Sequence, residues 1–70
     1  MIRLKLWRLQ EGLTQADAAK RLGMGESTLA VLESGRLRPT IAQLARLRAV
    51  FGEQAVTLFD QVRDRVDIPS

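Results

Sequence analysis

The side chains of this chain that could do chemistry are cations, carboxylates and hydroxyls, because the sequence contains no cysteine and no histidine. The absence of both residue types excludes disulfides, the common Zn²⁺ sites and catalysis by a nucleophile–histidine pair. The eight carboxylates show no pairing that would converge on an obvious pocket. We therefore expect a binding function, with no enzymatic activity, no metal and no cofactor.

The basic residues gather in the first two thirds of the chain. Residues 1–48 contain nine Lys or Arg and four Asp or Glu, a formal charge of +5, whereas residues 49–70 carry −2. The net charge of +3 is ordinary for a small domain and does not by itself indicate nucleic acid. Its uneven distribution favours an anionic partner at one end of the molecule and something else at the other.

Glycines and threonines mark the elements that must position these side chains. The glycines at positions 12, 23, 35 and 52 each follow a helix-like segment, where a left-handed C-terminal residue favours glycine. Thr14 can cap one helix, and Thr40 can cap another with Gln43 at the capping-box position. No strand alternation is present. The pattern predicts five helices over Ile2–Glu11, Gln15–Leu22, the stretch between Gly25 and Gly35, about Ile41–Phe51 and about Gln54–Val66.

The stretch from Gly12 to Gly35 predicts two short helices joined by a tight turn at Gly23. The polar N-terminus of the second helix would face outward. This geometry allows a protein to lay one helix into the major groove of DNA. The expected core residues are Trp7, Leu13, Ala16, Leu22, Met24, Leu29, Leu32, Leu44, Leu47 and Phe51.

These features resemble the Cro/C1-type (XRE-like) helix-turn-helix family. The resemblance covers about 50 of the 70 residues, from Leu4 to Gly52. It rests on Arg8, Gly12-Leu13-Thr14-Gln15, Ala19, Leu22-Gly23, Ser27-Thr28-Leu29, Leu32-Glu33-Ser34-Gly35, Pro39 and Leu44 to Leu47. It implies an all-α, five-helix Cro/C1-repressor-like domain. Residues 1–52 would form a four-helix core with the motif at about 15–34, and residues 53–70 a C-terminal helix with a short tail.

The resemblance also implies roles for individual residues. It places base contacts at Glu26, Ser27, Ala30 and Val31. It places phosphate contacts at Thr14, Gln15, Arg36, Arg38 and Thr40. Arg8 and Glu33 stand where the family often has an internal ion pair. The implied function is a small repressor or controller protein that binds double-stranded DNA at an inverted-repeat operator as a dimer.

The chain departs from this family at the reading helix. That helix carries no lysine or arginine, and Gly25 replaces the Ser or Thr often found at its cap. Glu26 can accept a hydrogen bond from a cytosine amino group, and Ala30 or Val31 can contact a thymine methyl. Exposed apolar residues at the centre of a surface also favour a protein partner, such as RNA polymerase, a toxin or another regulator. That alternative remains open.

The final predicted helix is the natural dimer element. We expect a homodimer through Phe51, Val56, Phe59 and Val62, although part of this helix can instead close the core of the monomer. No apolar run approaches the length of a membrane span, and no signal peptide opens the chain. These patterns lead us to expect a cytoplasmic protein, encoded by a bacterium or its phage.

Overall fold

Side-chain caps set the starts of two of the four α-helices in the part of the chain that the structure describes. The computed structural model describes residues 1–62, which contain α1 (Arg3–Gln10), α2 (Gln15–Leu22), α3 (Glu26–Ser34) and α4 (Ile41–Phe51). Before α2, the hydroxyl of Thr14 accepts a hydrogen bond from the N–H of Asp17. Before α4, Thr40 and Gln43 form the complete capping box expected from the sequence. These caps satisfy N–H groups that have no acceptor inside the helix.

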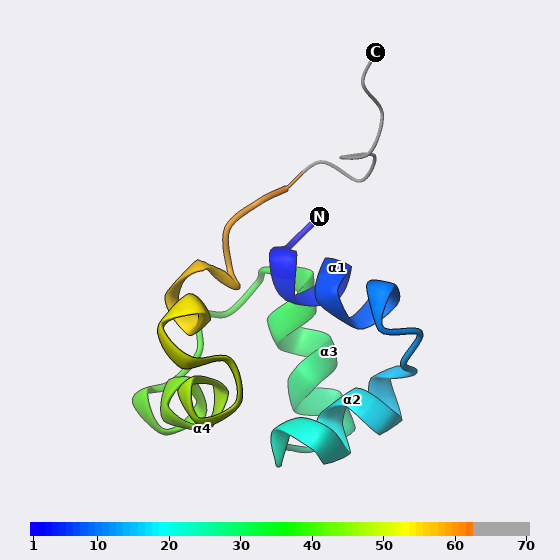
Figure 1. Ribbon diagram of the computed structural model, residues 1–70, viewed down its shortest axis with the longest axis horizontal. Helices are drawn as coiled ribbons and strands as arrows, with labels where there is room; N and C mark the ends of the chain where they lie inside the picture. Colours follow the sequence, from blue (N-terminus) through cyan, green and yellow to red (C-terminus); the bar gives the residue numbers. More distant parts are fainter. Residues whose placement is uncertain (63–70) are drawn as a thin grey trace.

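The turn between α2 and α3 depends on glycine. Gly23 ends α2 with φ of +71°, in the left-handed region that a side chain disfavours. The N–H groups that close this helix end donate to the carbonyls of Ala19 and Lys20. Figure 1 shows α3 drawn between α4 on one side and the α1–α2 pair on the other. The helix-turn-helix expected from the sequence is therefore present.

The core lies between these helices. Leu4, Leu29 and Leu47 are fully buried, and the small side chains of Ala18 and Ala19 allow α2 to approach its neighbours closely. The other buried apolar residues are Ile2, Leu22, Leu32, Ala55 and Leu58, with Trp7, Leu13, Met24, Leu44, Phe51 and Phe59 packed against them.

The prediction that Ala16 belongs to the core is wrong. Ala16 is exposed, because it lies two residues before the buried Ala18 and therefore on a different side of α2.

Among residues 1–62, no helix has both the length and the apolar character needed to cross a bilayer.

The predicted fifth helix is wrong over its described part. After α4 the chain forms only a short 3₁₀ helix, η1 (Gly52–Thr57), and then runs back beside the N-terminus. The N–H groups of Arg3 and Leu4 donate to the carbonyls of Asp60 and Leu58 at 3.0 and 2.8 Å. Gln61 forms an isolated antiparallel bridge with Ile2. The last part of the predicted helix, residues 63–66, lies outside the described residues.

The start of α1 explains this path. Ile2 precedes the helix and offers no capping side chain, so the first N–H groups of α1 need other acceptors. The backbone carbonyls of the 58–62 segment supply them, and burial of Leu58 fixes the segment in place. The apolar residues of the predicted fifth helix therefore close the core of the monomer.

Candidate nucleic-acid interface

The outer face of α3 is open to solvent. Glu26, Ser27 and Val31 are exposed, and Ala30 is half-buried. Leu29, Leu32 and Glu33 on the opposite face are buried. The structure therefore places the four residues expected to contact bases on one helix, with three of them accessible and the helix anchored behind them.

The N-terminus of α3 has no side-chain cap. Gly25 occupies the cap position, and the first helical residue is Glu26, whose negative charge is favourable at the positive end of the helix. The N–H groups at this end have no acceptor within the helix. The start of α3 thus presents backbone donors together with one acid and one hydroxyl, from Glu26 and Ser27.

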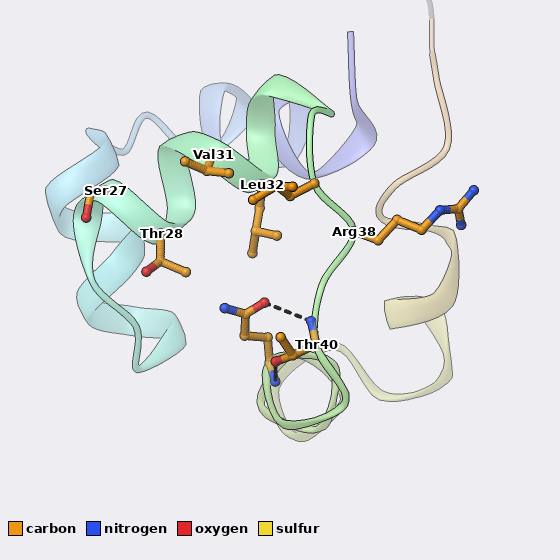
Figure 2. A pocket seen from close by; sticks show the side chains of 8 residues that line it. Ser27, Thr28, Val31, Leu32, Arg38 and Thr40 are labelled. Atoms are coloured by element: carbon orange, nitrogen blue, oxygen red, sulfur yellow. Dashed lines mark hydrogen bonds between the residues drawn. The ribbon is translucent and has the colours of Figure 1, made fainter.

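A groove separates α3 from the start of α4. It has a volume of about 290 Å³ and is lined by Ser27, Thr28, Val31, Leu32, Leu37, Arg38, Thr40 and Gln43. Figure 2 shows Thr28 and Thr40 on opposite walls of this groove. The hydroxyl and N–H of Thr40 are both engaged in the capping box with Gln43. An anion at this helix end would therefore meet the N–H groups of Ile41 and Ala42, which have no acceptor within the helix.

The loop between α3 and α4 carries the two arginines expected to contact phosphates. Both Arg36 and Arg38 are exposed. The N–H of Arg36 donates to the hydroxyl of Ser34 at 3.2 Å, which helps to shape the loop. Figure 2 shows the side chain of Arg38 extending away from Ser27 and Thr28. The structure therefore places both cations on the expected loop, but it does not bring the Arg38 guanidinium beside the outer face of α3.

A buried ion pair joins α1 to the end of α3. Arg8 Nε donates to Glu33 Oε2 at 2.7 Å, and Arg8 Nη2 donates to Glu33 Oε1 at 3.1 Å. The two side chains are only 11% and 3% exposed. Arg8 Nη1 also donates to the carbonyl of Leu13 at 3.0 Å, so the same guanidinium holds the α1–α2 turn. Arg8 is thereby engaged inside the protein.

Gln15 joins this network from the start of α2. Its Nε2 donates to Glu33 Oε1 at 3.2 Å, and its side chain is half-buried. Because an ionised carboxylate only accepts hydrogen bonds, it fixes which end of the Gln15 amide faces inward. The family resemblance predicts a phosphate contact for Gln15. The structure shows one of its N–H groups already bound to Glu33, which leaves the other N–H for an external acceptor.

Sequence reasoning missed Arg46. Its Nη1 donates to the carbonyl of Gly23 at 2.6 Å, so α4 holds the turn of the helix-turn-helix. A Cβ on Gly23 would lie 2.9 Å from the same nitrogen, so a side chain there would displace the Arg46 guanidinium from this hydrogen bond. The sequence shows only an arginine on a predicted helix. It does not indicate that the hydrogen-bond acceptor lies 23 residues earlier.

This contact leads to a first prediction. Gly23→Ala introduces a side chain at φ +71° and displaces Arg46, so we expect the free energy of unfolding to fall by about 1–2 kcal/mol or more. Gly12→Ala is the matched control, because Gly12 has φ of +69° with nothing near its Cβ position. Urea denaturation should show the larger loss at Gly23. In an Arg46→Met background that difference should vanish, and its persistence would contradict the contact.

The four residues expected at a dimer interface do not form one open patch. Phe51 packs edge-on against Trp7, with ring centroids 4.9 Å apart and planes at 83°. Phe59 also packs against the core, and Val62 is half-buried. Val56 is 58% exposed. Two of the four therefore serve the monomer, and Val56 is the one left most accessible.

Comparison with known proteins agrees with this geometry. A model of the helix-turn-helix domain family matches residues 2–58. An uncharacterized HTH-type transcriptional regulator of Methanocaldococcus jannaschii is 32% identical over 57 residues, 81% of this chain and 86% of the relative. Another, from Archaeoglobus fulgidus, is 30% identical over 57 residues, 81% of each chain. No solved structure matches significantly. These relatives are archaeal, so they lend no support to the bacterial or phage origin expected from the sequence.

Proposed function

The chain belongs to the helix-turn-helix domain family, one of the XRE-like families, and on that premise we propose that it is a DNA-binding transcriptional regulator. The observation that carries this proposal is the open outer face of α3, whose inner face is locked into the core. In the proposed complex α3 lies in the major groove, where Glu26, Ser27, Ala30 and Val31 meet base edges.

Phosphate contacts would hold α3 in register. Gln15 has one amide N–H to offer while the other stays on Glu33. Thr14 stands beside it at the N-terminus of α2, where backbone donors and the helix dipole favour an anion. On the far side of the DNA major groove, the other DNA strand would be contacted by Arg36, Arg38 and the start of α4 at Thr40. Figure 2 shows the Arg38 side chain extending away from Ser27 and Thr28, so in the proposed complex it contacts a phosphate outside the base-reading face of α3.

We propose that the protein acts as a dimer on an inverted repeat. A single α3 covers one half-site, and helix-turn-helix readers place two such helices about 34 Å apart, one turn of DNA. The dimer bound at the operator would then block or recruit RNA polymerase, as a small repressor or controller protein does. No ligand or catalytic step is required for this mechanism.

Selection of bound duplexes from a random pool, at two salt concentrations, tests the proposed function. The expected result is an enriched palindrome, with weaker retention at the higher salt because phosphate contacts release counterions. If no sequence is enriched at either salt concentration, the proposal of a sequence-specific DNA reader is wrong.

The dimer leads to a second prediction. We expect size-exclusion chromatography with light scattering to give twice the chain mass at micromolar concentrations. Val56→Asp should shift the protein to the monomer, because it puts a charge on the most exposed of the four proposed interface residues. Val50→Asp is the control, since Val50 is an exposed valine of α4 outside that set. A wild-type monomer, or equal effects of the two variants, would contradict the dimer.

One observation favours a second candidate function. Three large apolar side chains are exposed in α3 and the segment after it: Val31, Leu37 and Ile41 are 38%, 63% and 90% exposed, and Val31 and Leu37 line the same groove. Such a surface is suited to a protein partner, for example RNA polymerase, a toxin or another regulator. Failure of the DNA selection, together with loss of a partner complex on Val31→Asp, would favour this candidate.

A further inference from the structure

We propose that α3 discriminates DNA sequences mainly by apolar contact between Val31, supported by Ala30, and the C5-methyl group of a pyrimidine in the major groove. The methyl can belong to thymine or to 5-methylcytosine, the two bases with this group. The inference rests on the proposed function and names the feature of DNA that the site would read.

The hydrogen-bonding capacity of the open face is small. The sequence of α3 is ESTLAVLES, so the helix has no Arg, Lys, Asn or Gln. It therefore lacks the side chains that form paired hydrogen bonds to guanine or to adenine. Of its two acids, Glu33 is buried with Arg8. Glu26 can only accept a hydrogen bond, and Ser27 can donate or accept and so selects weakly.

The apolar capacity of the same face is larger. Val31 follows Ser27 by one helical turn and is exposed, and Ala30 follows Glu26 in the same way. Val31 also lines the groove toward α4 together with Thr28 and Leu37. The C5-methyl is the main apolar group that a base pair presents in the major groove. Contact with it would remove both the methyl and the valine side chain from water.

Glu26 separates the two sources of the methyl group. Cytosine presents its N4 amino donor next to C5, whereas thymine presents its O4 acceptor there. An acid one turn before Ala30 can accept from the amino group but repels O4. If Glu26 reaches the same base as Val31 and Ala30, 5-methylcytosine is preferred. If it reaches a neighbouring base, Glu26 does not discriminate between the two bases, and thymine and 5-methylcytosine are contacted alike.

Two parallel selections test the inference. One random pool contains thymine, and the other contains uracil at every thymine position. Uracil pairs with adenine in the same way and lacks only the methyl. A motif enriched from the thymine pool and lost or changed in the uracil pool supports the inference. The same motif from both pools overturns it, unless cytosine methylation shows the effect described below. No enrichment from either pool contradicts the proposed function and this inference with it.

The contact can then be assigned to Val31 by a double-mutant cycle. On the enriched duplex, uracil for thymine at the critical position should weaken binding about fourfold per methyl lost. Val31→Ala should weaken binding to the thymine duplex by a similar factor and leave binding to the uracil duplex nearly unchanged. Val50→Ala, at an exposed valine of α4, should preserve the full discrimination. Equal weakening of both duplexes by Val31→Ala would overturn the assignment to Val31.

Methylation of each cytosine in the enriched duplex identifies the source. A gain of about fourfold on 5-methylcytosine, which disappears in Val31→Ala or Ala30→Gly, supports methylcytosine as the ligand. Denaturation curves must show that these variants are folded. If neither uracil nor 5-methylcytosine changes the affinity of the wild-type chain at any position, the inference is wrong even though the protein binds DNA.

Discussion

Replacing Arg8 by methionine is expected to reduce the free energy of unfolding by about 3–5 kcal/mol, the cost of leaving one member of a buried pair without its partner. Glu33 is almost completely buried and would lose two hydrogen bonds from the guanidinium. The carbonyl of Leu13 would lose a donor as well. Because a chain of this size has only a few kcal/mol of stability in reserve, the variant should be largely unfolded or close to it.

Urea denaturation followed by circular dichroism measures this effect, with Trp7 fluorescence as a second probe. The control is Arg21→Met, which removes an exposed contact with Glu11 at 3.8 Å and should cost no more than about 1 kcal/mol. The double variant Arg8→Met/Glu33→Leu should recover much of the stability, because no buried charge remains unpaired. Comparable losses for Arg8→Met and Arg21→Met would show that the buried pair has no special role.

Removing both loop arginines should have the largest effect on DNA binding. For Arg36→Ala/Arg38→Ala we expect the slope of log K against log salt to become shallower by about 1.8 per protomer, about 0.9 for each lost phosphate contact. Affinity should fall on every duplex, whether or not it contains the selected site, because phosphates carry no sequence information. Fluorescence anisotropy titrations at several salt concentrations give both quantities.

The matched controls separate charge from position. Arg48→Ala removes an exposed arginine from α4, outside the proposed interface, and should change the slope much less. Ser27→Ala should alter the preference among sequences more than the total affinity. An unchanged slope in the double variant would mean that the loop does not touch DNA, and it would favour a protein partner for the same surface.

Local rules predicted the parts of the fold that local chemistry determines. Thr40 and Gln43 are three residues apart, and their capping box involves only these two residues at the start of α4. Gly23 ends α2 because its backbone conformation excludes most other residues. The ion pair between Arg8 and Glu33 was expected from the family resemblance alone, since nothing in their spacing of 25 residues brings them together.

Long-range contacts account for what the sequence could not show. The stripe containing Leu58 and Phe59 has helical spacing, but the segment serves as a source of carbonyls for a helix near the other end of the chain. The hydrogen bond from Arg46 to the carbonyl of Gly23 depends on how α4 packs against the turn, which the sequence does not indicate. The engagement of Gln15 with Glu33 likewise depends on how α2 and α3 pack. The predicted base and phosphate contacts remain predictions, because they need the partner.

The pairing of residues 58–62 with the start of α1 has a consequence for local opening. The amide hydrogens of Arg3 and Leu4 are shielded only while the carbonyls of Asp60 and Leu58 remain in place. Their exchange with deuterium therefore reports detachment of a segment more than 50 positions away in the sequence. Since Arg8 lies on the same short helix, we expect detachment of that segment to weaken the pairing of Arg8 with Glu33, which would show as lower protection of the α3 amides.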